Sequence, residues 1–191
     1  MSTALLVIDV QQSFQHRSYW REDELPGFRR SLLELDAGCR ARGVPIVHVL
    51  HEEPGSGGPF DPASGHVRLM DFVPGPPDAL FRKHVHSALV ESGLREWLEA
   101  RHIRRLIVTG LRTEQCCETT TRHASDLGYR VDFVTEATLT FPMKHASGRV
   151  YTPAEIRERT ELVLAGRFAR IATVSSALAS LDASASEARA T

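Results

Sequence analysis

The sequence has few cysteines, and their arrangement argues against a fold held together by disulfide bonds. Its 191 residues include three, Cys39, Cys116 and Cys117. Adjacent cysteines rarely bridge each other, and an odd number leaves one thiol free in any case. No Cys-x-x-Cys pair is present, which excludes the usual dithiol redox and structural zinc motifs. A reducing compartment, the cytoplasm, is therefore expected.

Long apolar runs and an excess of charge are also missing. No stretch approaches the roughly 20 apolar residues that a membrane-spanning helix needs, and the start, Met1-Ser2-Thr3, lacks the basic region of a signal peptide. The formal net charge of −1 gives no reason to expect nucleic acid or an anionic membrane as a partner. The length fits one compact domain, 1–191, whose Ala/Ser-rich tail from about Ala183 is expected to fray.

Short apolar segments alternate with amphipathic ones along the chain. The expected strands are 4–10, 44–50, one ending near Lys83, 103–109, 130–134 and 169–174. The expected helices run from Pro26 to Gly43, over 88–100 and 113–127, and from a capping box at Thr152 to about Arg167. This alternation predicts a three-layer, doubly wound α/β fold with a mainly parallel sheet and helices on both faces. Ligands bind beyond the carboxyl ends of the strands in such folds.

Three reactive side chains follow expected strands at that edge of the sheet, namely Asp9, Lys83 and Cys116. Each alone has an ordinary explanation, since an acid often caps a turn and a lysine is often a solvated charge. Cys116 is more informative because it lies in the first turn of an expected helix. Backbone N–H groups and the helix dipole lower the pKa of a thiol there, which favours the nucleophilic thiolate. Together, the three residues predict a catalytic cleft.

Three segments resemble the motifs of the isochorismatase-like hydrolases. Residues 5–14 (LLVIDVQQSF) resemble their opening motif, residues 83–89 (KHVHSAL) their lysine segment, and Gly110-x-x-Thr113-x-x-Cys116 their nucleophile segment. The similarity covers about residues 4–174. It implies a six-stranded sheet in the order 3-2-1-4-5-6 and a cysteine hydrolase that acts on a small molecule without a cofactor. A homo-oligomer, either a dimer or a tetramer, is also expected.

The resemblance implies a role for each residue. Asp9 would take the thiol proton of Cys116, Lys83 would hold both charges, and the thiolate would attack a carbonyl or amidine-type carbon. Backbone N–H groups of Arg112 and Cys116 would bind the oxyanion, next to a cis peptide bond between Leu111 and Arg112. Water would then hydrolyse the acyl-enzyme with Asp9 as the base.

Other residues near these motifs are candidates for contact with the substrate. They are Gln11, Phe14, Arg82 and Arg112. A solvated charge is the default expectation for both arginines. Thr113 lies three residues before Cys116 and is able to cap its N–H, which would remove an oxyanion donor. We expect the Thr113 side chain to point elsewhere.

A metal site is not expected. Nicotinamidases of this superfamily carry an Asp-x-His-Pro-x-x-His segment, whereas this chain has HVLHEEP at 48–54 and His66 further on. His48 is expected to be a packed core histidine, and His51 with Glu52 lacks the required spacing. A nicotinamidase is therefore disfavoured. The glycine-rich loop 51–76 is expected to act as a lid, because it does not open a helix after a strand as a phosphate-binding loop would.

Cys116 favours hydrolysis of a C–N bond in a small amide, ureido or related compound, because several true isochorismatases lack this cysteine. Two alternatives stay open. One is an isochorismatase-type hydrolase that cleaves a vinyl ether through Asp9 and Lys83 without covalent catalysis. The other is a catalytically idle, oligomeric binding module. A redox role for Cys116 and Cys117 is a third and weaker option.

Overall fold

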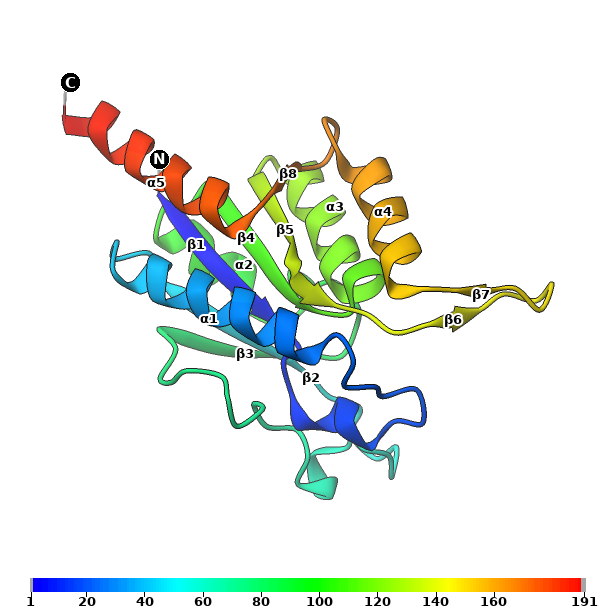
Figure 1. The fold of residues 1–191 in the computed structure, drawn as a ribbon. Coiled ribbons are helices and arrows are strands. Elements are labelled where there is room, and N and C mark those ends of the chain that lie inside the picture. The colour runs from blue at the N-terminus through cyan, green and yellow to red at the C-terminus, as the bar shows by residue number, and fades with distance from the viewer. Residues whose placement is uncertain (1, 190–191) are drawn as a thin grey trace.

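The structure is a computed structural model that describes residues 2–189, with the side chains of its last helix described as far as Ala183. Its centre is a six-stranded sheet in the order β3-β2-β1-β4-β5-β8, in which every pairing is parallel (Figure 1). The strands are β1 (Thr3–Ile8), β2 (Ile46–His51), β3 (Ala79–Lys83), β4 (Arg105–Leu111), β5 (Arg130–Leu139) and β8 (Arg170–Ala172). The predicted strand order is confirmed, with β8 as the sixth strand.

Helices cover both faces of the sheet, as predicted. They are α1 (Leu25–Arg40), α2 (Leu94–Ala100), α3 (Glu118–Asp126), α4 (Pro153–Leu164) and α5 (Val174–Arg189). Helices α1 and α5 pack on one face, and α2, α3 and α4 pack on the other (Figure 1). None of the described helices has the length and apolar character needed to cross a membrane.

Strand β1 supplies the core on both faces. Leu5 and Val7 pack with the apolar residues of α1 and α5, whereas Leu6 and Ile8 pack with those of α2 and α3. All residues of β1 are buried. A strand buried on both faces reads as a continuous apolar run, because its side chains alternate between two cores. The end of this strand is therefore fixed in the middle of the molecule.

Several predicted boundaries are wrong for identifiable reasons. The helix expected over 88–100 begins only at Leu94, because Glu91 and Gly93 have φ angles of +52° and +82° and break the helical path. The strand expected to end at Val174 ends at Ala172, and Thr173 and Ser176 cap the start of α5 with reciprocal side-chain hydrogen bonds. The capping box predicted at Thr152 is present and opens α4.

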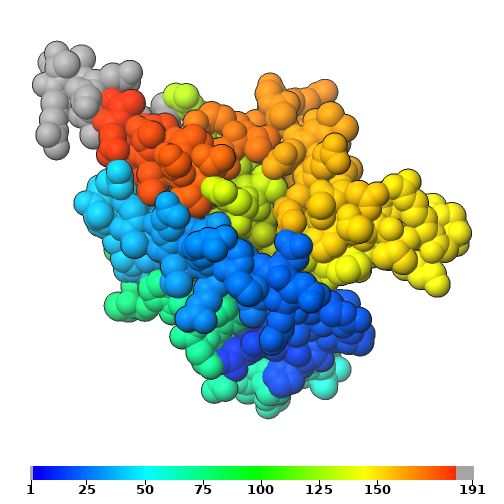
Figure 2. Space-filling model, viewed as in Figure 1, coloured from blue at the N-terminus to red at the C-terminus, as the bar shows by residue number. Residues whose placement is uncertain are grey.

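Two further features were not predicted. Strands β6 (Met143–Lys144) and β7 (Val150–Tyr151) form a short antiparallel hairpin that projects from the domain (Figures 1 and 2). Helix α5 extends to Arg189 through the segment that was expected to fray from about Ala183. That fraying stays a prediction, since side chains beyond Ala183 and residues 190–191 lie outside the described part.

Gly110 is essential to the contact between β1 and β4. Its φ is +126°, and a Cβ atom there would lie 1.9 Å from the carbonyl oxygen of Ile8, its register partner on β1. We expect Gly110→Ala to lower the free energy of unfolding by about 3 kcal/mol or more, through backbone strain and overlap. Urea unfolding measures this change.

The matched control is Gly27→Ala in α1, where a Cβ atom meets nothing within 4 Å. This control is expected to be neutral or to stabilise the protein by up to about 1 kcal/mol, because alanine is the better helix former. Equal unfolding free energies for the two variants would contradict the steric argument.

Candidate active site

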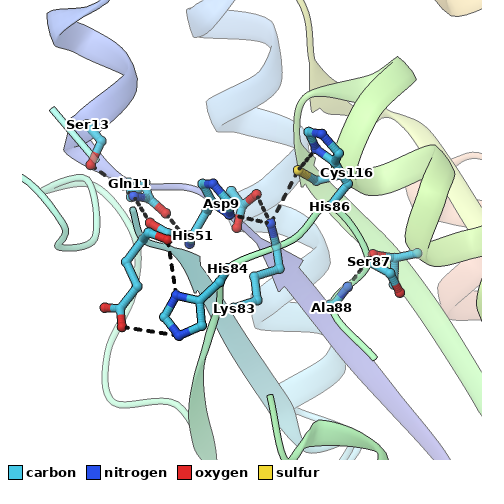
Figure 3. Close-up of polar contacts among 12 residues, drawn as sticks. Asp9, Gln11, Ser13, His51, Lys83, His84, His86, Ser87, Ala88 and Cys116 are labelled. Atoms are coloured by element: carbon cyan, nitrogen blue, oxygen red, sulfur yellow. Dashed lines mark hydrogen bonds and ion pairs between the residues drawn. The ribbon is translucent and has the colours of Figure 1, made fainter. Parts of the chain in front are cut away.

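The three predicted catalytic residues meet at the carboxyl edge of the sheet. Asp9 follows β1, Lys83 ends β3, and Cys116 lies in the π-helical turn η3 (Thr113–Cys117) after β4. Lys83 Nζ lies 2.8 Å from Asp9 Oδ2 and 3.3 Å from Cys116 Sγ (Figure 3). Asp9 and Lys83 are fully buried, and Cys116 is 6% exposed. The structure thus brings a carboxylate, an ammonium group and a thiol together in one compact cluster.

A sharp turn after β1 directs the Asp9 carboxylate into this cluster. Asp9 has a φ of +54°, in the left-handed region that aspartate tolerates better than most residues. Its N–H donates to the Val49 carbonyl at 2.8 Å, and its carbonyl accepts from the N–H of Gln11 at 2.8 Å. The backbone on both sides of Asp9 is therefore anchored, so the carboxylate has a fixed position.

Lys83 is held as a charged ammonium. Burial alone would lower its pKa, but the charge of Asp9 and the contact with the Cys116 sulfur raise the pKa above its ordinary value. Lys83 therefore keeps its charge at neutral pH and sits between two groups that either carry or can acquire a negative charge.

The thiol of Cys116 differs from the sequence-based expectation. Burial raises its pKa, and the charge of Asp9 raises it further, while Lys83 lowers it. The predicted lowering at a helix start is wrong, because the desolvation of the sulfur and the nearby carboxylate outweigh the favourable contacts. Cys116 is therefore a thiol at rest, and its activation requires a base in contact with it. The neighbouring carboxylate of Asp9 is the candidate for this base, and that role stays a prediction.

The backbone around Cys116 matches the expected nucleophile segment. The peptide bond between Leu111 and Arg112 is cis, as expected. The hydroxyl of Thr113 hydrogen-bonds with Thr138 Oγ1 at 2.8 Å and caps no N–H of the turn, which confirms that it points elsewhere. π-helical turns occur often at functional sites. The use of the Arg112 and Cys116 N–H groups as oxyanion donors stays a prediction.

Cys117, next to the candidate nucleophile, points away from the cluster. It is fully buried among the apolar side chains between the sheet and α3, and burial raises its pKa well above the ordinary value. Cys39 is fully buried in the opposite core, where burial raises its pKa to about 12. All three cysteines are free thiols, and of the three only Cys116 reaches the site.

Two histidines that the sequence analysis did not place at the site contact the cluster. His86 Nδ1 lies 3.7 Å from Cys116 Sγ, and the His86 side chain is exposed (Figure 3). His51 Nδ1 lies 3.3 Å from Lys83 Nζ, and burial followed by the charge of Lys83 lowers the His51 pKa. His84 instead turns away to Glu52. No periodic pattern identifies His86, because the chain leaves β3 in an irregular bend.

Gln11 and Phe14, which were predicted to contact the substrate, both interact with other residues of the protein. The Gln11 side chain is fully buried, donates to the His51 carbonyl and to Ser13 Oγ at 2.9 Å each, and accepts from the His51 N–H at 2.8 Å. It links the ends of β1 and β2. Phe14 is buried with its ring edge against Phe60 at a centroid distance of 5.0 Å. The contact of both residues with a substrate stays a prediction.

Arg82 and Arg112, the two arginines that were candidates for substrate contact, differ in their burial. Arg82 is exposed and pairs with Glu52 at 2.8 Å, in agreement with a surface charge. Arg112 is buried, so the solvated default is wrong for it. Its Nη2 lies 2.8 Å from Glu114 Oε1, and its guanidinium lies 4.9 Å from the centroid of the Tyr19 ring. The positive charge of Arg112 is thus already matched by a partly buried carboxylate.

The loop expected to be a lid is attached to the short helix η1 (Gln12–His16) next to the site. Arg68 Nε donates to Gln12 Oε1 at 2.7 Å, and Ser13 Oγ donates to the carbonyl of His66 at 3.0 Å. Phe60 within the loop is buried in the core. The loop and η1 therefore form one packed wall beside the cluster.

Among the side chains that the structure describes, which end at Ala183, no group of three or more could hold a metal ion. His48 is fully buried, and burial lowers its pKa to about 4, so it is the neutral core histidine that was expected. His51 contacts Lys83, a cation, which disfavours a metal ion at the same nitrogen.

Comparison with known proteins agrees with this geometry. A family model of the isochorismatase domain matches residues 3–150. The chain belongs to the isochorismatase family of hydrolases. An isochorismatase-family structure from Chromobacterium violaceum superposes with a TM-score of 0.87 at 26% identity, covering 95% of this chain and 94% of the other.

Two relatives have names that specify an activity. Nicotinamidase 3 of Arabidopsis thaliana is 33% identical over 152 residues, which are 72% of this chain and 73% of that protein. A streptothricin hydrolase of Streptomyces noursei is 30% identical over 148 residues, which are 75% of this chain and 51% of that protein. These names describe the relatives, and this isochorismatase-family chain shares their domain.

Cysteine labelling tests the assignment of the nucleophile. We expect iodoacetamide to modify Cys116 before Cys117 or Cys39, since the other two thiols have no exposed surface. The labelling rate should rise steadily with pH above neutrality, because the pKa of Cys116 is raised and only the thiolate reacts. Fragmentation mass spectrometry separates the adjacent cysteines. Cys117→Ala serves as the control and should keep the label, and label on Cys117 in the wild type would contradict the assignment.

Metal removal tests the expectation that no cofactor is needed. We expect full activity after dialysis against EDTA, because a thiol, a base and backbone donors already supply the attacking group and the charge stabilisation. The metal content is measured on the same sample. A loss of rate that returns on adding zinc, iron or manganese would overturn this expectation and favour the nicotinamidase type of site.

Proposed function

We propose that this chain is a cysteine-dependent hydrolase that cleaves a C–N bond in a small amide, ureido or related substrate through a thioester acyl-enzyme. The observation that carries the proposal is the contact of one lysine with both a carboxylate and a thiol, at 2.8 Å and 3.3 Å, in a buried cluster. A sulfur nucleophile with a base and a fixed cation is the arrangement needed for covalent acyl transfer.

The reaction begins with proton transfer from the Cys116 thiol to the Asp9 carboxylate. The thiolate attacks the substrate carbon, and the negative charge that develops on oxygen faces the N–H groups of Arg112 and Cys116. Collapse of the tetrahedral intermediate breaks the C–N bond, Asp9 gives the thiol proton to the leaving nitrogen, and a thioester is left on the sulfur. Asp9 then takes a proton from the water that attacks the thioester and returns it to the sulfur as the C–S bond breaks.

The named relatives support C–N hydrolysis as the reaction class. A nicotinamidase and a streptothricin hydrolase share this domain at 33% and 30% identity. Nicotinamide itself is disfavoured here, because the expected metal segment is missing after β2. It nevertheless belongs in any substrate panel, since the identity to the plant nicotinamidase covers 73% of that protein.

The decisive experiment is to trap an acyl adduct on Cys116. The protein is incubated with a panel of amides, ureido compounds and lactams, quenched in acid and mapped by mass spectrometry. An acyl group on Cys116 identifies the nucleophile and the substrate together. Turnover of isochorismate by Cys116→Ala would overturn the proposal in favour of vinyl-ether hydrolysis, and no adduct or turnover with any compound would favour an idle binding module.

Substitutions of Asp9 and Lys83 test their separate roles in the proposed reaction. We expect Asp9→Asn and Lys83→Ala each to lower kcat/KM by roughly 1,000-fold or more, because the loss of one residue that acts in a catalytic unit removes most of the activity of the whole unit. Asp9→Asn should also label faster with iodoacetamide than the wild type, because the Asp9 charge raises the pKa of Cys116. Faster labelling with lost turnover distinguishes a missing base from a misfolded site.

The control is Arg95→Ala, at an exposed arginine of α2 that pairs with Glu99, and it should keep wild-type activity. Urea unfolding shows whether Lys83→Ala is folded, since leaving Asp9 buried without its cation costs about 3–5 kcal/mol. The double variant Asp9→Asn/Lys83→Met removes both charges and should recover part of that loss. A single variant that keeps more than about a tenth of the wild-type rate would contradict its assigned role.

A cytoplasmic location and a homo-oligomer are part of the proposal. A reducing compartment suits an enzyme whose nucleophile is a free thiol. The projecting hairpin of β6 and β7 exposes Met143 and Val150, and a two-stranded hairpin of this size is marginal on its own. We therefore expect this hairpin to contact a second copy of the chain in the dimer or tetramer.

A further inference from the structure

The ammonium group of Lys83 makes one contact that the proposed reaction does not use. Its Nζ lies 2.8 Å from Asp9 Oδ2 and 3.3 Å from Cys116 Sγ, the two groups between which the proton moves. A third neighbour, His51 Nδ1, also lies 3.3 Å from Nζ (Figure 3). An ammonium group has three hydrogens to donate and no acceptor, so each of the three neighbours is able to take one of them.

The sheet places His51 beside Lys83. The two residues end the neighbouring strands β2 and β3 and are register partners, so both side chains belong to the carboxyl edge. The Gln11 amide holds the His51 backbone from both sides, since it donates to the His51 carbonyl at 2.9 Å and accepts from the His51 N–H at 2.8 Å. The His51 ring packs edge to face with Phe60 at a centroid distance of 5.6 Å. The ring is therefore held in position before any substrate binds.

The contact with Lys83 determines which nitrogen of His51 carries the proton. Because the ammonium group donates, Nδ1 must offer its lone pair, and the proton of the neutral ring belongs on Nε2. His51 Nε2 lies 3.3 Å from Glu53 Oε1, which is able to accept this hydrogen. A protonated ring would instead bring a second cation into contact with Lys83. The neutral ring with its proton on Nε2 is therefore the form that fits the site.

We propose that His51 is a positioning residue, whose neutral Nδ1 accepts one hydrogen of the Lys83 ammonium group and thereby directs the other two to Asp9 and Cys116. This inference rests on the proposed function. His51 exchanges no proton with the substrate and acts only through Lys83. Without this acceptor one N–H of a fully buried cation has no partner, and the ammonium group turns away from the sulfur to find one.

Three ionisable groups act on the His51 ring, each from a different element. Burial lowers the His51 pKa most and Lys83 on β3 lowers it further, whereas Asp9 after β1 and Glu53 after β2 raise it. The other groups that contact this residue, an amide and a phenyl ring, carry no charge. The net result is a pKa below the ordinary value of 6.5. The contact with Lys83 is therefore present at neutral pH and is lost only as the pH falls below that value.

Two substitutions of nearly equal shape test the proposal. His51→Asn places a carbonyl oxygen where Nδ1 lies, and His51→Leu places a methyl group there. The rate at which 4-nitrophenyl acetate acetylates Cys116 is measured by acid quenching and mass spectrometry. We expect His51→Leu to slow acetylation roughly 10- to 100-fold, because a hydrogen bond to a charged group is lost, and His51→Asn to slow it less than about 3-fold.

His84→Leu is the matched control, because His84 contacts the carbonyl of Glu52 rather than the cluster, and its rate should be unchanged. Urea unfolding of each variant shows whether it is folded. Equal slowing by His51→Asn and His51→Leu would show that only the packing of the ring matters, and an unchanged rate in His51→Leu would show that the third acceptor is not needed. Either result overturns the inference while Cys116 is still acetylated.

Nitrogen NMR of the ¹⁵N-labelled wild-type chain keeps the proposal testable if His51→Leu does not fold. The signals of the His51 ring are assigned by their loss in His51→Asn. We expect an unprotonated Nδ1 and a protonated Nε2 at neutral pH, and a proton on Nδ1 would overturn the inference.

The pH dependence of acetylation gives a second readout from the same two proteins. The ratio of the wild-type rate to the His51→Asn rate should be constant at neutral pH and should fall where the NMR signals show protonation of His51, because only the histidine loses its acceptor there. Effects of other titrating groups cancel in this ratio. A ratio that stays constant while His51 becomes protonated would overturn the inference.

Failure of the proposed function gives a different result. Wild-type protein and all three variants would then form no acetyl adduct on Cys116, whichever nitrogen of His51 carries the proton. In that case Lys83 has no reaction to support, and the inference falls with the function on which it rests.

Discussion

The ion pair between Lys83 and Asp9 is the constraint on which the site depends. Both side chains are fully buried, at 2.8 Å from each other. Removing one member of such a pair leaves an uncompensated charge in the interior, at a cost of about 3–5 kcal/mol. The pair therefore stabilises only an arrangement in which the ends of β1 and β3 are held at a fixed distance, with β2 between them. The sulfur of Cys116 completes the cluster as the third group around the ammonium.

The fold provides this arrangement through the order of its strands. Strand β1 lies between β2 and β4, so its end meets the segments that follow both neighbours. The left-handed turn at Asp9 and the close approach of Gly110 to Ile8 bring the carboxylate and the η3 turn together. Ligand sites of doubly wound sheets form at such a point because the connections diverge to opposite faces and leave the strand ends open. The chemistry follows from this topology.

The features that sequence predicts well here are those fixed by local pattern. The apolar runs of the strands, the capping box at Thr152 and the nucleophile motif each depend on a few neighbouring residues. The late start of α2, the raised pKa of Cys116 and the contact of His86 with the sulfur depend on groups brought together by the whole sheet. A thiol at a helix start favours the thiolate only where solvent or cations outweigh burial, and the degree of burial is a property of the tertiary structure.

The raised pKa of Cys116 is compatible with a nucleophilic role because the cluster moves charge without creating it. Asp9 carries one negative charge, Lys83 one positive charge, and the thiol none, so the net charge of the three is zero. Proton transfer from Cys116 to Asp9 leaves the sum at zero and shifts the negative charge from one neighbour of Lys83 to another, at 2.8 Å and 3.3 Å. Creating a new charge in a buried site is costly, whereas moving one between two contacts of the same cation avoids most of that cost. The thiol can thus stay protonated until a substrate carbon is in place to accept the sulfur.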